Sequence, residues 1–126
     1  MELKNGERID DLQFKGLKII QNENGFCFGI DAVLLSDFAK NMKKADNVID
    51  LCTGTGIVAI LLAGKVEKIK KIYAVEIQEA VAEMAKRSMK LNKLENKIEV
   101  LNKDLKEIHE ILKPRNNRCY YSKSAV

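Results

Sequence analysis

Apolar positions along the middle of the chain alternate between two patterns, short continuous runs and runs with helical spacing. The segments follow one another as strand Asn47–Leu51, helix Ile57–Gly64, strand Lys71–Ile77, helix Glu79–Asn92, strand Lys97–Leu101 and helix Leu105–Leu112. Strands that alternate with helices usually pair in parallel. The pattern therefore predicts a doubly wound α/β fold of about three parallel strands, with helices on both faces of the sheet.

The N-terminal part has a different pattern. Leu12–Gln21 is rich in β-forming residues, Asn22–Gly25 is a turn signal, and Phe26–Phe28 resumes the extended pattern. We expect a β-hairpin there, followed by a helix over Ala32–Lys40 with Asp31 as its N-cap.

The C-terminal tail has no clean period after Pro114, although Cys119–Val126 has the composition of a short strand. We expect three parts: an N-terminal hairpin and helix over residues 1–46, a Rossmann-like half over residues 47–113, and an atypical tail over residues 114–126.

Composition limits the function only weakly. The 126 residues suit one domain, and 22 basic against 18 acidic residues give a net charge of +4, which favours an anionic partner without identifying it. The cysteines Cys27, Cys52 and Cys119 form neither a metal-ligand spacing nor an even set for disulfides, so we expect a cytoplasmic protein without a metal site. No apolar run approaches the roughly 20 residues that span a bilayer, so we expect no membrane partner.

The candidate chemistry lies where the predicted strands end. A turn with two glycines, Gly54-Thr-Gly56, follows the first strand, and Asp50, Glu76 and Asp104 lie at or just past the ends of the three strands. Glu76 follows Gly56 by 20 residues, the spacing at which a carboxylate accepts hydrogen bonds from an adenosine ribose. Asp104 suits either an adenine contact or the N-cap of a helix that begins at Leu105.

Two ligands fit this turn, a nicotinamide dinucleotide (NAD) and S-adenosylmethionine (SAM). Gly54 to Ala59 satisfies the dinucleotide pattern G-x-G-x-x-A, so an NAD-binding oxidoreductase domain remains the alternative. Asp50 favours SAM, because a carboxylate repels a pyrophosphate and attracts the sulfonium and ammonium groups of SAM.

Four stretches carry a family resemblance: Asp50–Gly56, Tyr73–Ile77 (YAVEI), Asn102–Asp104 (NKD) and the leader Gly25–Leu35 (GFCFGIDAVLL). The first three resemble motifs of Rossmann-like SAM-dependent methyltransferases. With Arg8–Leu12 and Leu17–Gln21, the leader resembles the bacterial valine tRNA (adenine-N6)-methyltransferase group. This resemblance covers about Glu7 to Lys113.

The resemblance implies SAM as cofactor and an adenine in tRNA as substrate. It implies that Gly54 and Gly56 lie near the methionine moiety, that Glu76 binds the ribose, that Asp104 contacts the adenine, and that the segment with Gly29 and Asp31 covers the cofactor. The implied cofactor-binding residues are Gly29, Asp31, Asp50, Thr53, Gly54, Thr55, Gly56, Glu76, Ile77, Asp104 and Leu105.

The catalytic Asn-Pro-Pro-Tyr motif of that group has no counterpart here, because Pro114 is the single proline and no asparagine precedes it. We therefore assign no catalytic residue. We expect an interrupted methyltransferase, inactive alone; an enzyme completed by a partner chain and a non-catalytic SAM-binding module are the alternatives. Loss of the later strands would leave one edge of Asn47–Leu51 unpaired, which predicts self-association.

Overall fold

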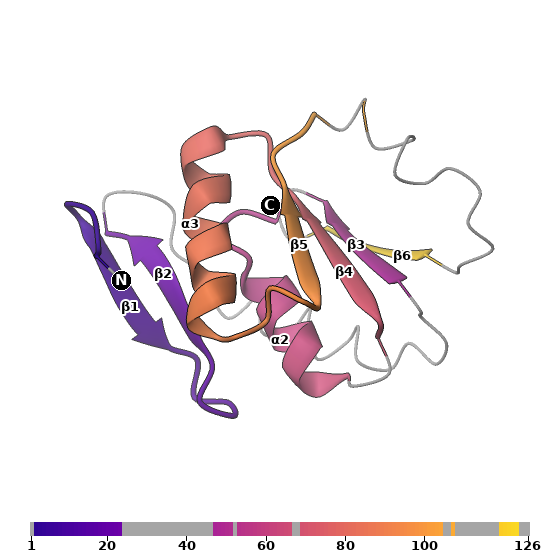
Figure 1. Cartoon of the computed structure of the whole chain (residues 1–126), viewed down its shortest axis with the longest axis horizontal. Helices are drawn as coiled ribbons and strands as arrows, with labels where there is room; N and C mark the ends of the chain where they lie inside the picture. Colours follow the sequence, from indigo (N-terminus) through magenta and orange to yellow (C-terminus); the bar gives the residue numbers. More distant parts are fainter. Residues whose placement is uncertain are drawn as a thin grey trace.

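A computed structural model describes residues 2–23, 47–51, 53–66, 69–104 and 107, and the backbone of residues 119–123. Its central element is a four-stranded parallel sheet in the order β5-β4-β3-β6 (Figure 1). The elements are β1 (Glu7–Asp11), β2 (Lys18–Asn22), β3 (Asn47–Leu51), α2 (Ile57–Lys65), β4 (Lys71–Val75), α3 (Glu79–Leu91), β5 (Ile98–Leu101) and β6 (Cys119–Lys123). The predicted α/β alternation from β3 to β5 is confirmed, with element ends shifted by one or two residues.

The hairpin lies earlier in the chain than the sequence predicts. β1 pairs antiparallel with β2, from Glu7 opposite Asn22 to Asp11 opposite Lys18. The turn of this hairpin lies between Leu12 and Leu17, within the predicted strand Leu12–Gln21, and the amide N–H of Leu12 donates to the carbonyl of Leu17 (2.9 Å). Residues 24 and 25 of the predicted turn lie outside the described residues. Residues 13, 15 and 16 in this turn have positive φ. The predicted strand Phe26–Phe28, the Asp31 cap and the helix Ala32–Lys40 lie outside the described residues.

The tail contributes β6, which pairs in parallel with β3 over its whole length, from Asn47 opposite Cys119 to Leu51 opposite Lys123. The expectation of an unpaired β3 edge is therefore wrong. The backbone of β6 pairs with this edge of β3, which removes the reason for expecting self-association through it.

Both described helices lie on one face of the sheet. Their apolar side chains join those of Val48, Ile72 and Ile98, which are neighbours across the three strands, in one large core. A smaller cluster around Ile49 and Val75 occupies the opposite face. The helix expected over Leu105–Leu112 lies outside the described residues. Among the described helices, none is long and apolar enough to cross a membrane.

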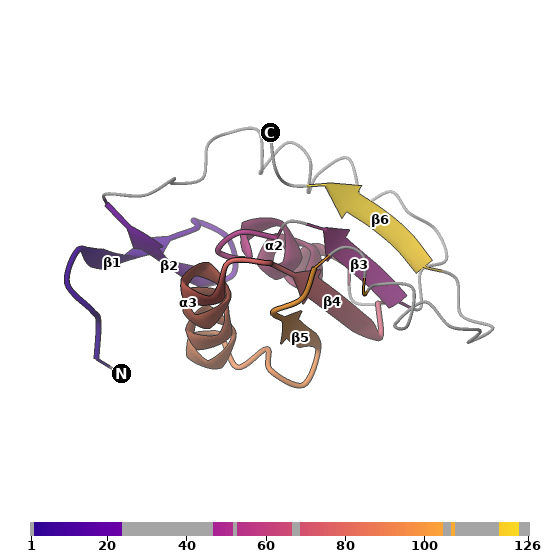
Figure 2. The ribbon, with the colours of Figure 1, turned by 90° about the horizontal axis from the view of Figure 1, so that it is seen from above.

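The hairpin packs against α3, on the side of that helix away from the sheet (Figures 1 and 2). The hydroxyl of Ser88 accepts the amide N–H of Ile20 (2.9 Å). The side chain of Asn92 accepts the N–H of Lys18 (2.8 Å) and donates to its carbonyl (2.6 Å). Polar side chains of α3 and of its C-cap residue Asn92 thus form hydrogen bonds with backbone groups of β2, as a neighbouring strand would.

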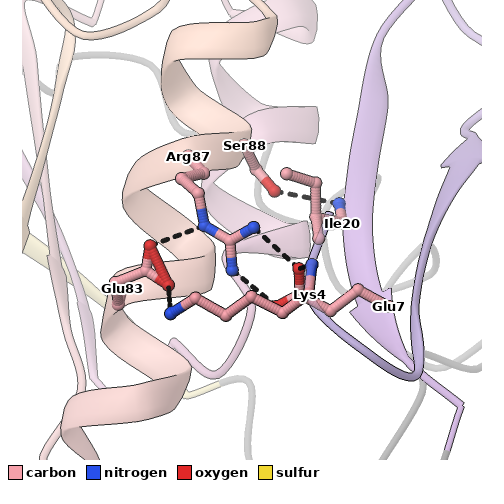
Figure 3. Close-up of polar contacts among 6 residues, drawn as sticks. All are labelled: Lys4, Glu7, Ile20, Glu83, Arg87 and Ser88. Carbon is pink, nitrogen blue, oxygen red and sulfur yellow. Dashed lines mark hydrogen bonds and ion pairs between the residues drawn. The ribbon is translucent and has the colours of Figure 1, made fainter. Parts of the chain in front are cut away.

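An ion-pair network also joins the hairpin to α3 (Figure 3). The guanidinium of Arg87 donates to both carboxylate oxygens of Glu7 (2.7 and 2.5 Å) and to Glu83 (2.5 Å), which also pairs with Lys4 (3.0 Å). The Arg87 fork lowers the pKa of Glu7 from 4.5 to about 2.

Candidate functional site

The glycine turn leaves the end of β3 and leads into α2. The N–H of Thr53 donates to the carbonyl of Val75 at the end of β4 (2.8 Å), and the N–H of Gly56 donates to the carbonyl of Thr53 (3.0 Å). Gly54 and Gly56 have φ values of 61° and 93°, a region that disfavours other residues. The sequence places both glycines where the backbone needs them.

The two glycines differ in what surrounds them. A Cβ on Gly56 would lie 2.6 Å from the terminal methyl of Met89 and 3.7 Å from Ala85, so this glycine lets α3 pack closely on the turn. A Cβ on Gly54 would meet no described residue within 4 Å. The backbone at Gly54 is therefore open on the side where a side chain would stand.

Glu76 lies directly after β4 and connects the turn to the start of α3. Its Oε1 accepts the N–H of Gly54 (3.0 Å), and its Oε2 accepts the N–H of Gln78 (3.0 Å). Its own N–H donates to the carbonyl of Leu101 at the end of β5 (2.9 Å). The residue is only 8% exposed, so its carboxylate is held in one orientation at the carboxyl end of the sheet.

Asp50, which the sequence places beside the turn, is fully buried in β3. Its carboxylate accepts the hydroxyl of Thr53 (2.6 Å), so it anchors the first residue of the turn.

Asn102 belongs to the Asn102–Asp104 motif but is not among the predicted site residues. Its Nδ2 donates to the carbonyls of Glu76 and Ile77, both at 2.9 Å, and so joins the segment after β5 to the segment after β4. A polar residue directly after a strand was the available signal. Its partners are backbone carbonyls, however, and these leave no mark in the sequence.

Asp104 begins a turn past β5. The N–H of Glu107 donates to the carbonyl of Asp104 (2.9 Å), and the Glu107 carboxylate accepts the N–H of Asp104 (3.4 Å). The contact from the Asp104 N–H to the Glu107 side chain is one of the two hydrogen bonds of a capping box, which supports the N-cap interpretation of Asp104. That interpretation is compatible with a ligand contact.

Of the predicted site residues, the structure brings eight to the carboxyl ends of β3, β4 and β5. They are Asp50, Thr53, Gly54, Thr55, Gly56, Glu76, Ile77 and Asp104. The side chain of Ile77 is 62% exposed, an unusual position for a large apolar residue. Gly29, Asp31 and Leu105 lie outside the described residues.

The sequence and the fold of this chain are similar to those of known proteins. The TRM5/TYW2 methyltransferase domain matches residues 20–119. A tRNA1(Val) (adenine(37)-N6)-methyltransferase of Histophilus somni is 32% identical over 95 residues, which cover 75% of this chain and 40% of the relative.

Two solved structures are similar in fold as well as in sequence. aTrm5, solved in complex with tRNALeu, superposes with a TM-score of 0.66 at 27% identity, over 82% of this chain and 30% of that one. Trm5 of Methanocaldococcus jannaschii, solved with adenosine, gives 0.60 at 26% identity, over 80% and 30%. This chain thus spans well under half of the proteins that it resembles, and it belongs to the TRM5/TYW2 methyltransferase domain family.

Proposed function

We propose that this chain is the SAM-binding part of a tRNA methyltransferase. The observation that carries the proposal is the geometry of Glu76. Each of its carboxylate oxygens accepts one backbone N–H, from Gly54 and from Gln78. A carboxylate oxygen has two acceptor positions, so each retains one for a hydroxyl group. Two neighbouring acceptors of fixed orientation suit the two hydroxyls of a ribose.

The residues around Glu76 fit the rest of SAM. Gly54 leaves room for a ligand beside the turn, and the exposed Ile77 offers an apolar surface to an adenine ring. The buried charge of Asp50 disfavours the pyrophosphate of NAD and favours the cationic groups of SAM. Membership of a methyltransferase family supports the same choice over the oxidoreductase alternative.

In this proposal, bound SAM supplies an activated methyl group on its sulfonium. Glu76 holds the ribose, the turn at Gly54 approaches the methionine part, and the segment near Asp104 borders the adenine. We extend the site to Thr53, Thr55 and Gly56 in the turn, and to Gly29, Asp31 and Leu105. Together these groups orient the methyl for attack by an acceptor that other residues must position.

We propose tRNA as the acceptor, with the amino group of an adenine as the target. The name of the Histophilus somni relative supports this choice. A net charge of +4 suits phosphate contacts, and these would weaken as salt rises. Such a substrate implies a cytoplasmic protein. Residues 1–46 would cover the cofactor, residues 47–113 would bind it, and the tail from residue 114 would complete the sheet through β6.

A matched pair of glycine substitutions tests the proposal. Gly54 (φ 61°) and Gly16 (φ 71°) both adopt positive φ, and at both a Cβ would meet no described residue within 4 Å. Alanine at either position costs about 1–2 kcal/mol of stability through backbone strain. We expect Gly54→Ala to weaken binding of S-adenosylhomocysteine in calorimetry, while Gly16→Ala, in the hairpin turn, leaves binding unchanged. Equal affinity for both variants would argue against a ligand at the glycine turn.

A further inference from the structure

Glu76 orients a ligand only if the backbone that carries it is fixed, and the segment after β4 is short. Only Glu76, Ile77 and Gln78 separate the end of β4 from the start of α3. The carbonyls of Glu76 and Ile77 are consecutive along the backbone. One group, the Nδ2 of Asn102, donates a hydrogen bond to each of them (2.9 Å each).

The Asn102 contacts complete a set that holds every polar group of Glu76. The amide N–H binds Leu101, the two carboxylate oxygens bind Gly54 and Gln78, and the carbonyl binds Asn102. The first three partners are backbone groups, which truncation of a side chain does not remove. Asn102 is the one side chain in this set.

We infer that Asn102 is a positioning residue that sets the ribose specificity of the cofactor site, by fixing the carbonyls of Glu76 and Ile77 so that the Glu76 carboxylate faces the ligand. The inference rests on the proposed function, because it assigns a ribose to Glu76. Without Asn102, the two carbonyls turn toward water and the segment gains freedom. The carboxylate then no longer distinguishes a ligand with a 2′-hydroxyl from one that lacks it.

The experiment compares S-adenosylhomocysteine with its 2′-deoxy analogue by calorimetry on the full chain. The wild-type protein should bind the ribose form about 10-fold more tightly or better, the usual effect of one hydrogen bond to a charged group. In Asn102→Ala this preference should fall to within about 2-fold, with weaker binding of the ribose form. Asn102→Asp, which has the same shape but cannot donate to carbonyls, should behave in the same way and serves if the alanine variant does not fold.

Asn92 provides a matched control. Its Nδ2 also donates to two backbone carbonyls, those of Lys18 (2.6 Å) and Ser88 (2.8 Å), but between α3 and the hairpin. Asn92→Ala should lower thermal stability and leave the ribose preference intact.

The outcomes separate this inference from the proposed function. A wild-type protein that binds neither ligand contradicts both. A wild-type protein that prefers the ribose form, with the same preference in folded Asn102→Ala and Asn102→Asp, contradicts only the positioning role. Loss of the preference in the Asn102 variants but not in Asn92→Ala supports the inference.

Discussion

Removing the Glu7 carboxylate should weaken the contact between the hairpin and α3 and change how stability depends on pH. The carboxylate is 4% exposed and forms a two-bond contact with Arg87, itself 15% exposed. The shift of the Glu7 pKa from 4.5 to about 2 corresponds to roughly 3 kcal/mol at full strength. Lys4 and Glu83 of the same network are 67% and 39% exposed, so solvent screens part of its charge. We therefore expect Glu7→Gln to cost about 1–2 kcal/mol at pH 7.

The sign follows from the direction of the shift. The pKa is depressed in the folded state, so the contribution of Glu7 is present above about pH 4.5 and is lost as pH falls toward about 2. Urea unfolding at several pH values measures it: the stability difference between wild type and Glu7→Gln should shrink from pH 6 to pH 3. Glu99→Gln, an exposed carboxylate on β5, is the control and should show little difference. A difference between wild type and Glu7→Gln that is zero at pH 7, or constant with pH, would refute this reasoning.

Three further predictions address packing and activity. Gly56→Ala should lower the free energy of unfolding by about 1–3 kcal/mol, because it strains a φ of 93° and displaces Met89; unchanged thermal melting would contradict it. Ser88→Ala should cost about 1–3 kcal/mol in urea unfolding, because the buried N–H of Ile20 loses its acceptor, while the exposed Lys90→Ala should have little effect. The 126-residue chain alone should transfer no labelled methyl from SAM to unmodified tRNA, since its sequence holds no Asn-Pro-Pro-Tyr motif to grip the target amine; robust incorporation would overturn this.

The sequence predicts the sheet from β3 to β5 well, because these strands are mostly buried and rich in apolar residues. It does not predict β1 (Glu7–Asp11), for the opposite reason. β1 reads Glu-Arg-Ile-Asp-Asp, is mostly exposed, and is held by backbone pairing and by Arg87 of a distant helix. The composition of Cys119–Val126 indicates a short strand, and β6 forms there. Its pairing with β3 does not follow from the sequence, because composition does not specify the partner strand.

The candidate site also contains features that the sequence predicts and features that it does not. Parallel strands end at one edge of a sheet, so the meeting of Gly54 with Glu76 follows from their positions after β3 and β4. The roles of Asp50 and Asn102 do not follow from position. Asp50 turns out to anchor Thr53 from within the sheet, and Asn102 acts on carbonyls that every residue possesses.

The central claim, that Glu76 and the glycine turn receive SAM, is tested most directly by calorimetry with S-adenosylhomocysteine and NAD. The wild-type chain should prefer S-adenosylhomocysteine, and Glu76→Ala should weaken that binding by about 1–3 kcal/mol, the usual cost of unmet polar partners. Glu99→Ala should bind as the wild type does, because that carboxylate is exposed on β5. Tighter binding of NAD, or unchanged S-adenosylhomocysteine affinity in folded Glu76→Ala, would contradict the account.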